Sequence, residues 1–132
     1  MMFQTKNYYH VEYLGEAGIT HTCLLALCNL IQTHSDLSYA LLLTNDQSHA
    51  LILKDQSESY YIIRSGFTSG YPGEGPKGLA TALTILNKHE IETEETLITS
   101  KMMKKLNNSL LSDEDIDLIF KQKIIRPIQL HD

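Results

Sequence analysis

The feature that most constrains this chain is a glycine-rich stretch, residues 64–78. It holds five of the seven glycines and two of the three prolines. An apolar run at 60–63 precedes it, and a segment with helical periodicity, 79–89, follows it. Glycine tolerates backbone conformations that other residues rarely adopt, and shaped loops on a rigid scaffold are frequent binding sites. The stretch therefore predicts a shaped loop between a strand and a helix, and we expect that loop to carry the function.

Length and charge limit the classes of protein to consider. A chain of 132 residues with 42% hydrophobic and 20% charged residues is expected to form one domain, residues 1–132, with one modest core. The net charge is −5, and Arg64 and Arg126 are the two arginines, so a nucleic-acid partner is disfavoured. No apolar run approaches the roughly 20 residues needed to cross a bilayer. Residues 1–10 lack the apolar core of a signal peptide. We therefore expect a cytoplasmic protein with no membrane partner.

Hydrophobic patterning predicts an α+β fold. Three short apolar or aromatic segments, 39–44, 49–54 and 59–63, are separated by four-residue polar turns, which is typical of an antiparallel meander. The middle segment is almost wholly apolar and is expected to be buried on both faces. Residues 7–14 predict a strand, and the turn signal at 15–18 favours a return strand at 19–21. The periodicity at 23–33 predicts a helix. We expect the meander to pack against two or three helices.

The last third of the chain predicts shorter elements. Residues 91–99 alternate acidic with apolar or threonine residues, which is typical of an edge strand with one solvated face. A short helix is expected at 101–107. Ser112, followed by three acidic residues, is a good start for another helix. A final extended segment is expected at 124–130.

The glycine-rich stretch has the features of an anion site. Pro76 suits the first turn of a helix, and Gly75 suits the cap before it. Free backbone N–H groups at a helix N-terminus attract anions. Basic side chains stand at both ends of the loop, and two aromatic rings lie between them. The predicted ligand-binding residues are Arg64, Phe67, Tyr71, Gly73, Glu74, Gly75, Lys77 and Gly78. They favour a small non-catalytic module that binds an anionic, nucleotide-like ligand.

Glu74 decides between this interpretation and a purely architectural one. The spacing of the glycines matches neither the phosphate loop of nucleotide hydrolases nor the dinucleotide fingerprint. A carboxylate at Glu74 competes with a ligand for the N–H groups of the helix start. If this side chain points away, the loop is a binding site. If it satisfies the helix start, the loop is architecture and the function lies on another surface.

Cys23 and His49 support an alternative, enzymatic interpretation. Cys23 stands near the start of a predicted helix, and His49 opens a later strand. This order resembles the core of papain-like and transglutaminase-like enzymes. The resemblance covers about a third of the chain, and it implies a hydrolase or transferase with Cys23 as nucleophile and His49 as base. Arg64 and Ser65 occupy the place where those families have an asparagine or aspartate. We lean towards a protein that is not an enzyme.

A protein partner is the third hypothesis. The acidic clusters at 90–95 and 113–117 are compatible with a basic partner, as in immunity or inhibitor proteins. The histidines show no metal-ligand spacing, so no metal and no cofactor is predicted. A homo-oligomer is compatible with so small a domain that has apolar strands. The expected partner is thus an anionic small molecule or, alternatively, a basic protein.

Overall fold

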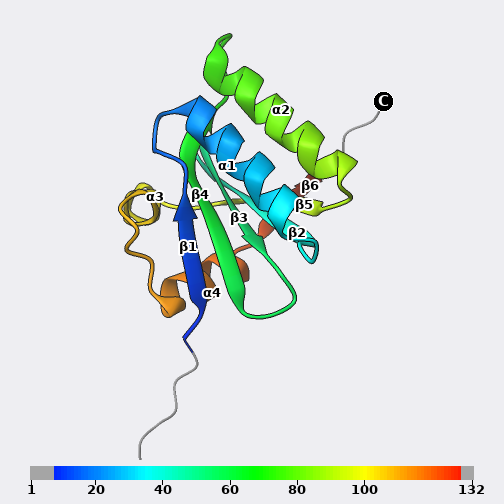
Figure 1. The fold of residues 1–132 in the computed structure, drawn as a ribbon. Helices are drawn as coiled ribbons and strands as arrows, with labels where there is room; N and C mark the ends of the chain where they lie inside the picture. Colours follow the sequence, from blue (N-terminus) through cyan, green and yellow to red (C-terminus); the bar gives the residue numbers. More distant parts are fainter. Residues whose placement is uncertain (1–7, 129–132) are drawn as a thin grey trace, which may run out of the picture.

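A computed structural model describes residues 8–128 and shows a single α+β domain (Figure 1). It contains six strands and four helices. The strands are β1 (His10–Leu14), β2 (Tyr39–Asn45), β3 (Ser48–Lys54), β4 (Ser59–Thr68), β5 (Glu92–Leu97) and β6 (Ile124–Ile128). The helices are α1 (Thr20–Thr33), α2 (Glu74–Lys88), α3 (Ser100–Asn107) and α4 (Asp113–Lys121). The predicted α+β class is confirmed.

The strands form one mixed sheet in the order β1-β4-β3-β2-β5-β6. The predicted antiparallel meander is its centre, because β2 pairs antiparallel with β3 and β3 with β4. The next pairs outward are parallel, β1 with β4 and β2 with β5. The sheet is therefore not purely antiparallel. Parallel neighbours need long crossover connections, and α1 and α2 lie within those connections.

Helices cover both faces of the sheet, which gives a three-layer domain (Figure 1). One core joins α1 and α2 to one face, and it includes Leu27, Leu53 and Leu86. The second core joins α3 and α4 to the other face, and it includes Ile52 and Leu106. Successive strand residues point to opposite faces, so β3 supplies both cores. Its residues 50–53 are fully buried, which confirms the burial expected of the middle strand.

The start of the chain differs from the prediction. The expected return strand at 19–21 does not form, because α1 begins at Thr20. A single bridge between Glu16 and Ile19 is all that remains of the expected hairpin. Strand β1 instead runs parallel to β4, with His10 opposite Ser59. The first residues of the predicted 7–14 strand fall partly outside the described part of the chain, since the description begins at residue 8.

The glycine-rich stretch is mostly strand and helix. Strand β4 continues through Arg64 to Thr68, and α2 begins at Glu74 rather than at Pro76. Only residues 69–73 connect the two elements. The pairing of β3 with β4 shifts register between His49 and Leu51, which is typical of a β-bulge in this part of β4. The predicted loop is thus real but much shorter than the composition suggested.

The acidic segment after α2 is not an edge strand. Strand β5 lies between β2 and β6, and its Glu95 side chain is buried. The predicted helix start at Ser112 is confirmed, since its hydroxyl accepts from the Asp115 N–H and the Asp115 carboxylate accepts from the Ser112 N–H. The final extended segment is β6, which forms one edge of the sheet. The end of that prediction, residues 129–130, lies outside the described residues.

Candidate functional site

The glycines of the stretch lie where other chain segments approach closely. A Cβ atom at Gly66 would collide with the Cys23 sulfur and the Ile19 carbonyl. A Cβ atom at Gly78 would collide with the γ-methyl of Thr20. Glycine is the residue that permits such backbone approach. These two glycines therefore let α1 pack directly on β4 and on α2.

A shallow cleft of about 370 Å³ opens at the start of α2. Glu74, Lys77 and His21 are among its lining residues, whereas Arg64 is not. Gly73 caps α2 without a side-chain hydrogen bond, and Glu74 is the acidic residue of the first helical turn. A carboxylate there complements the helix dipole. The negative charge thus stands where an anion would have to bind.

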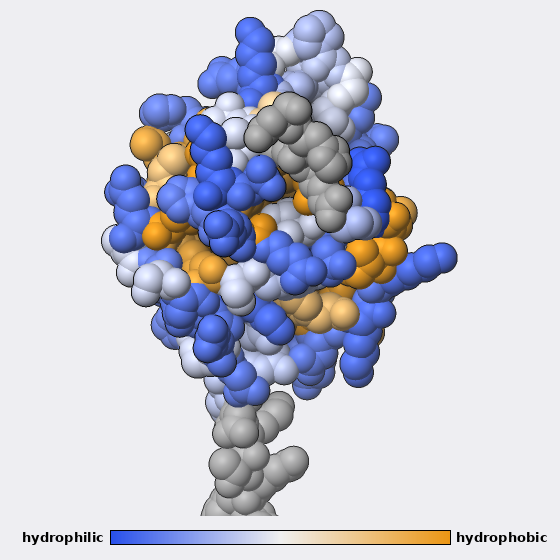
Figure 2. Space-filling view, turned by 90° about the vertical axis from the view of Figure 1, so that its right-hand side faces the viewer, coloured by the Kyte–Doolittle hydropathy of each residue, from blue (hydrophilic) through white to orange (hydrophobic). Residues whose placement is uncertain are grey.

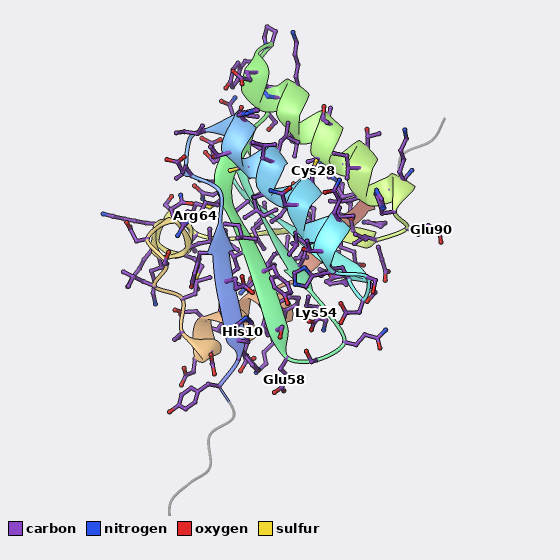
Figure 3. The ribbon with its side chains drawn as sticks, viewed as in Figure 1. His10, Cys28, Lys54, Glu58, Arg64 and Glu90 are labelled. Atoms are coloured by element: carbon purple, nitrogen blue, oxygen red, sulfur yellow. The ribbon has the colours of Figure 1, made fainter. Side chains whose placement is uncertain are left out.

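Arg64 serves a different part of the molecule (Figure 3). Its guanidinium donates from Nε to the Asn107 carbonyl at 3.2 Å and from Nη1 to the Gly15 carbonyl at 2.7 Å. Its Nη2 also donates to the Ser109 hydroxyl. The C-terminal end of a helix carries unpaired carbonyl groups that attract cations. Arg64 therefore ties β4 to the end of α3 and to the β1–α1 loop, away from Lys77.

Phe67 and Tyr71, the two aromatic residues of the predicted site, lie in different environments. Phe67 is fully buried in the core beneath α1 and α2. Tyr71 is 48% exposed, and its hydroxyl lies 2.8 Å from the Thr68 hydroxyl. Gly75 is buried at the same point, against Thr68. The structure therefore brings Gly73, Glu74, Lys77 and Gly78 together in one cleft and leaves Arg64 and Phe67 outside it.

Cys23 and His49 do not form a catalytic pair. The Cys23 side chain is fully buried, and its sulfur lies 3.4 and 3.3 Å from the carbonyl oxygens of Glu16 and Arg64, which share its single S–H donor. Burial raises the pKa of this thiol, with weaker opposing effects from its hydrogen bonds. A nucleophilic cysteine needs a lowered pKa and access to solvent. Cys23 is a packing residue.

His49 belongs to a buried polar network that the sequence did not predict. Its Nδ1 lies 2.8 Å from the Thr44 hydroxyl, and its Nε2 lies 2.7 Å from the Ser69 hydroxyl. Thr44 donates its single hydroxyl proton to Glu95 at 2.6 Å. The Thr44 oxygen is then free to accept from His49 Nδ1–H, and His49 Nε2 accepts from Ser69. Burial lowers the pKa of His49, so the ring is held neutral.

The network ends at the edge strand β6. Arg126 Nε donates to the second oxygen of Glu95 at 2.7 Å. Glu95 is thus a buried carboxylate with both oxygens occupied, as a buried charge requires. The alternation of residues 91–99 indicated a solvated glutamate, and no local signal distinguished the buried Glu95 from Glu92, which is exposed, or from Glu94, which is half-buried. Its burial follows from the addition of β6 to the sheet.

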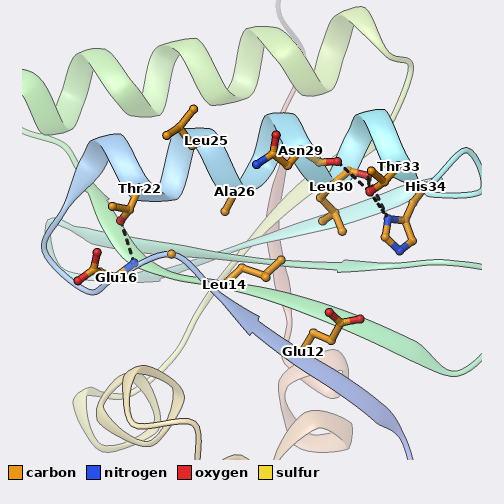
Figure 4. A pocket seen from close by; sticks show the side chains of 11 residues that line it. Glu12, Leu14, Glu16, Thr22, Leu25, Ala26, Asn29, Leu30, Thr33 and His34 are labelled. Carbon is orange, nitrogen blue, oxygen red and sulfur yellow. Dashed lines mark hydrogen bonds between the residues drawn. The ribbon is translucent and has the colours of Figure 1, made fainter.

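The larger open depressions lie elsewhere. One, of about 470 Å³, runs between β1 and α1 (Figure 4). Its floor is apolar, with Leu14 and Leu30, and the carboxylates of Glu12 and Glu16 stand beside it. Figure 4 shows that the Thr22 hydroxyl accepts a hydrogen bond from the backbone N–H of Glu16. With carboxylates as its charged groups, this groove has no features of an anion site.

A second groove, of about 450 Å³, lies between α3, α4 and the end of β5. It is lined by Leu97, Ile98, Thr99, Met102, Leu118, Ile119 and Gln122. Figure 2 shows that apolar side chains gather in separate patches among hydrophilic ones on the face that it presents. We call the depression lined by these seven residues the α3–α4 groove. No signal in the sequence indicated this groove.

None of the helices in the described part of the chain is long and apolar enough to cross a membrane. Within residues 8–128, no group of three or more histidine, cysteine, aspartate or glutamate side chains is placed to hold a metal ion.

Comparison with known proteins gives one structural likeness. No family model matches the sequence, and no curated protein sequence matches it. Among solved structures, a chain of respiratory complex I from Thermus thermophilus has a similar fold, with a TM-score of 0.70. The two chains share 18% identity, and the match covers 89% of this chain and 94% of that one. At 18% identity, this likeness shows that the two chains share a fold and shows nothing more.

This likeness corrects several predictions made from the sequence. The sequence predicted a small cytosolic ligand-binding module, with an anionic ligand or a basic protein as its partner and with no membrane partner. The similar chain is instead a part of respiratory complex I. The predicted ligand-binding function, partners and cytoplasmic location are therefore wrong on this comparison. The domain has the fold of a chain that belongs to a larger assembly.

Proposed function

We propose that this chain is a non-catalytic subunit that docks on a larger protein assembly. The observation that carries the proposal is the fold shared with a chain of respiratory complex I over nearly the whole length of both chains. A whole-domain match means that the resemblance does not depend on a single motif. In such a role the domain binds other subunits through its surface and catalyses no reaction.

The polar groups of the interior support this role. No buried side-chain nitrogen or oxygen among the described residues lacks a hydrogen-bond partner. An active site usually combines a pocket with convergent polar groups whose pKa values are perturbed. Here Cys23 and His49 have shifted pKa values, but burial explains both and each is occupied by structural hydrogen bonds. We therefore infer that the buried polar groups stabilise the fold and do not take part in a reaction.

The surface supports it as well. Within residues 8–128, eight large hydrophobic side chains are exposed, including Leu97, Leu118 and Leu25, each about half exposed. Two of them, Leu97 and Leu118, line the same groove. Apolar side chains that converge on one depression are typical of a protein-interaction site.

Fractionation of the source cell tests the proposal. The full chain would carry a small affinity tag, and both the soluble fraction and a mild-detergent extract of the membranes would be separated by size. We expect the chain, of 15.0 kDa, to migrate with partners of fixed stoichiometry through a second, ion-exchange step. Mass spectrometry of that fraction then asks whether the partners are subunits of a respiratory enzyme. A chain that migrates alone in both fractions contradicts the proposal.

A further inference from the structure

We propose that the α3–α4 groove binds an amphipathic helix of a partner protein whose apolar face is flanked by acidic residues. The inference rests on the proposed function, because it assigns the surface through which the subunit docks. It follows from three properties of the groove, namely its apolar lining, the positive charge at its rim and the lack of an unpaired strand edge among the residues that line it.

The lining of the groove leaves large apolar side chains uncovered. Leu97 at the end of β5 is 53% exposed, and Leu118 on α4 is 51% exposed. Ile98 and Ile119 are buried beneath them and belong to the core between α3, α4 and the sheet. The groove is therefore continuous with a packed core, and an apolar side chain placed in it would extend that core. Such burial is worth about 25 cal/mol for each Å² removed from water.

The rim of the groove is basic. Lys101 precedes Met102, a lining residue, on α3. Lys121 follows Leu118 by one helical turn on α4. Lys123 precedes Ile124, which pairs with Thr96, the residue before Leu97. All three lysines are exposed. None of them forms an ion pair within residues 8–128.

Three of the four acidic residues of α4 have partners other than these lysines. Asp113 and Asp117 accept hydrogen bonds from the Tyr9 N–H and hydroxyl, and Asp115 pairs with Lys105 at 2.6 Å. These carboxylates are engaged with β1-side and α3 groups rather than with the rim lysines. An apolar groove with free lysines at its rim complements an apolar face bordered by acidic side chains.

The arrangement of strands favours a helix as the occupant. A partner strand would need an unpaired strand edge. The strand that borders the groove, β5, is paired on both sides, with β2 and β6, and the edge strand β6 contributes no residue to the lining of the groove. The groove lies between two helices and offers side chains rather than backbone groups. Amphipathic helices bind in such grooves through apolar residues spaced three and four apart. A groove of about 450 Å³ accommodates a few such side chains.

Two designed helical peptides test the assignment. Both carry leucines at i, i+3, i+4 and i+7. One has glutamates beside this face, and the other has lysines at the same positions. We expect the glutamate peptide to shift backbone amide NMR signals of residues 97–102 and 118–123 in the full chain. We expect L118E to weaken binding at least tenfold, and K121E/K123E to weaken it several-fold at low salt.

Leu25 provides the matched control. It lies on a helix on the opposite side of the sheet and is 49% exposed, as against 51% for Leu118. We expect L25E to bind the glutamate peptide like the unmodified chain. Equal binding of the lysine peptide, NMR shifts centred elsewhere, or equal loss of binding in L25E would overturn the proposal. Self-association of the chain that L118E abolishes would also overturn it, because the groove would then hold a second copy.

The same variants separate this inference from the proposed function. In the cell, L118E is expected to leave the assembly while L25E remains in it. If the unmodified chain migrates alone yet binds the glutamate peptide in the groove, the proposed function fails and the groove assignment stands. If the assembly forms and retains L118E as well as L25E, the groove assignment fails and the proposed function stands.

Discussion

The backbone of Gly78 on α2 lies directly against the γ-methyl group of Thr20 on α1. The hydroxyl of Thr20 donates to the Gly66 carbonyl at 2.7 Å, which fixes the rotamer that points the methyl at α2. The two helices touch at this point with no side chain of α2 between them. One methyl group thus sets how closely α1 and α2 can pack.

We expect G78A to destabilise the protein by up to about 2 kcal/mol. Alanine gains about 1 kcal/mol over glycine in helix propensity, but its Cβ would collide with Thr20, and overpacking costs about 1–3 kcal/mol. Chemical denaturation measures the difference. The T20S substitution removes the methyl and keeps the hydroxyl, so the double variant G78A/T20S should recover most of the loss. A G78A variant more stable than the unmodified chain would contradict the packing.

His49 predicts a pH-dependent stability. Burial lowers the pKa of the folded imidazole below its usual value of about 6.5. Between that folded value and about 6.5 the unfolded chain binds a proton that the folded chain does not. The free energy of unfolding therefore falls as pH decreases through this window, by up to about 1.4 kcal/mol per pH unit. The contribution is fully present above about pH 7.

Denaturation at pH values from 7.5 to 5 measures this slope, and H49Q provides the comparison. Glutamine does not titrate, so H49Q should lose the His49 part of the pH dependence even if it is less stable throughout. The lowered pKa of Asp115, which its partners Lys105 and Ser112 stabilise as the carboxylate, affects stability only at more acidic pH. An unchanged slope in H49Q would show that His49 is not the titrating group.

Thr44 is expected to be essential for the buried network. T44V has nearly the same shape but removes the hydroxyl that joins His49 to Glu95. Both partners then lose a hydrogen bond inside the protein, and one of them is a charged group. An unsatisfied buried group costs about 1–3 kcal/mol, so we expect a loss of about 3 kcal/mol in thermal or chemical denaturation. T44S keeps the hydroxyl and should lose much less.

The thiol of Cys23 is expected to be unreactive in the folded protein. Its sulfur is buried, and burial raises its pKa, so little thiolate is present at neutral pH. Cys28 is only half-buried. With a thiol-specific reagent at pH 7.5, the folded chain should show one accessible thiol, and C28S should show none until denaturant is added. Rapid labelling of folded C28S would contradict the buried position of Cys23.

Much of the fold was predictable because its signals are local. The polar turns at 45–48 and 55–58 and the apolar segments beside them determine the central meander. The capping box at Ser112 determines the start of α4. Periodicity predicted α1 and α2, although α2 begins earlier than expected, because Glu74 and Gly75 already adopt helical conformation.

The sequence by itself thus determined the α+β class, the central strands and the approximate position of each helix. Tertiary structure alone decided that β1 pairs parallel with a strand far along the chain, and that Glu95 is buried between β2 and β6. It also decided the role of the glycines. A glycine that shapes a ligand loop and a glycine that lets a helix approach look the same in sequence. The two kinds of glycine differ in the residue that packs against them in the folded protein. At Gly78 that residue is Thr20, which is distant in sequence and comes into contact only when the chain folds.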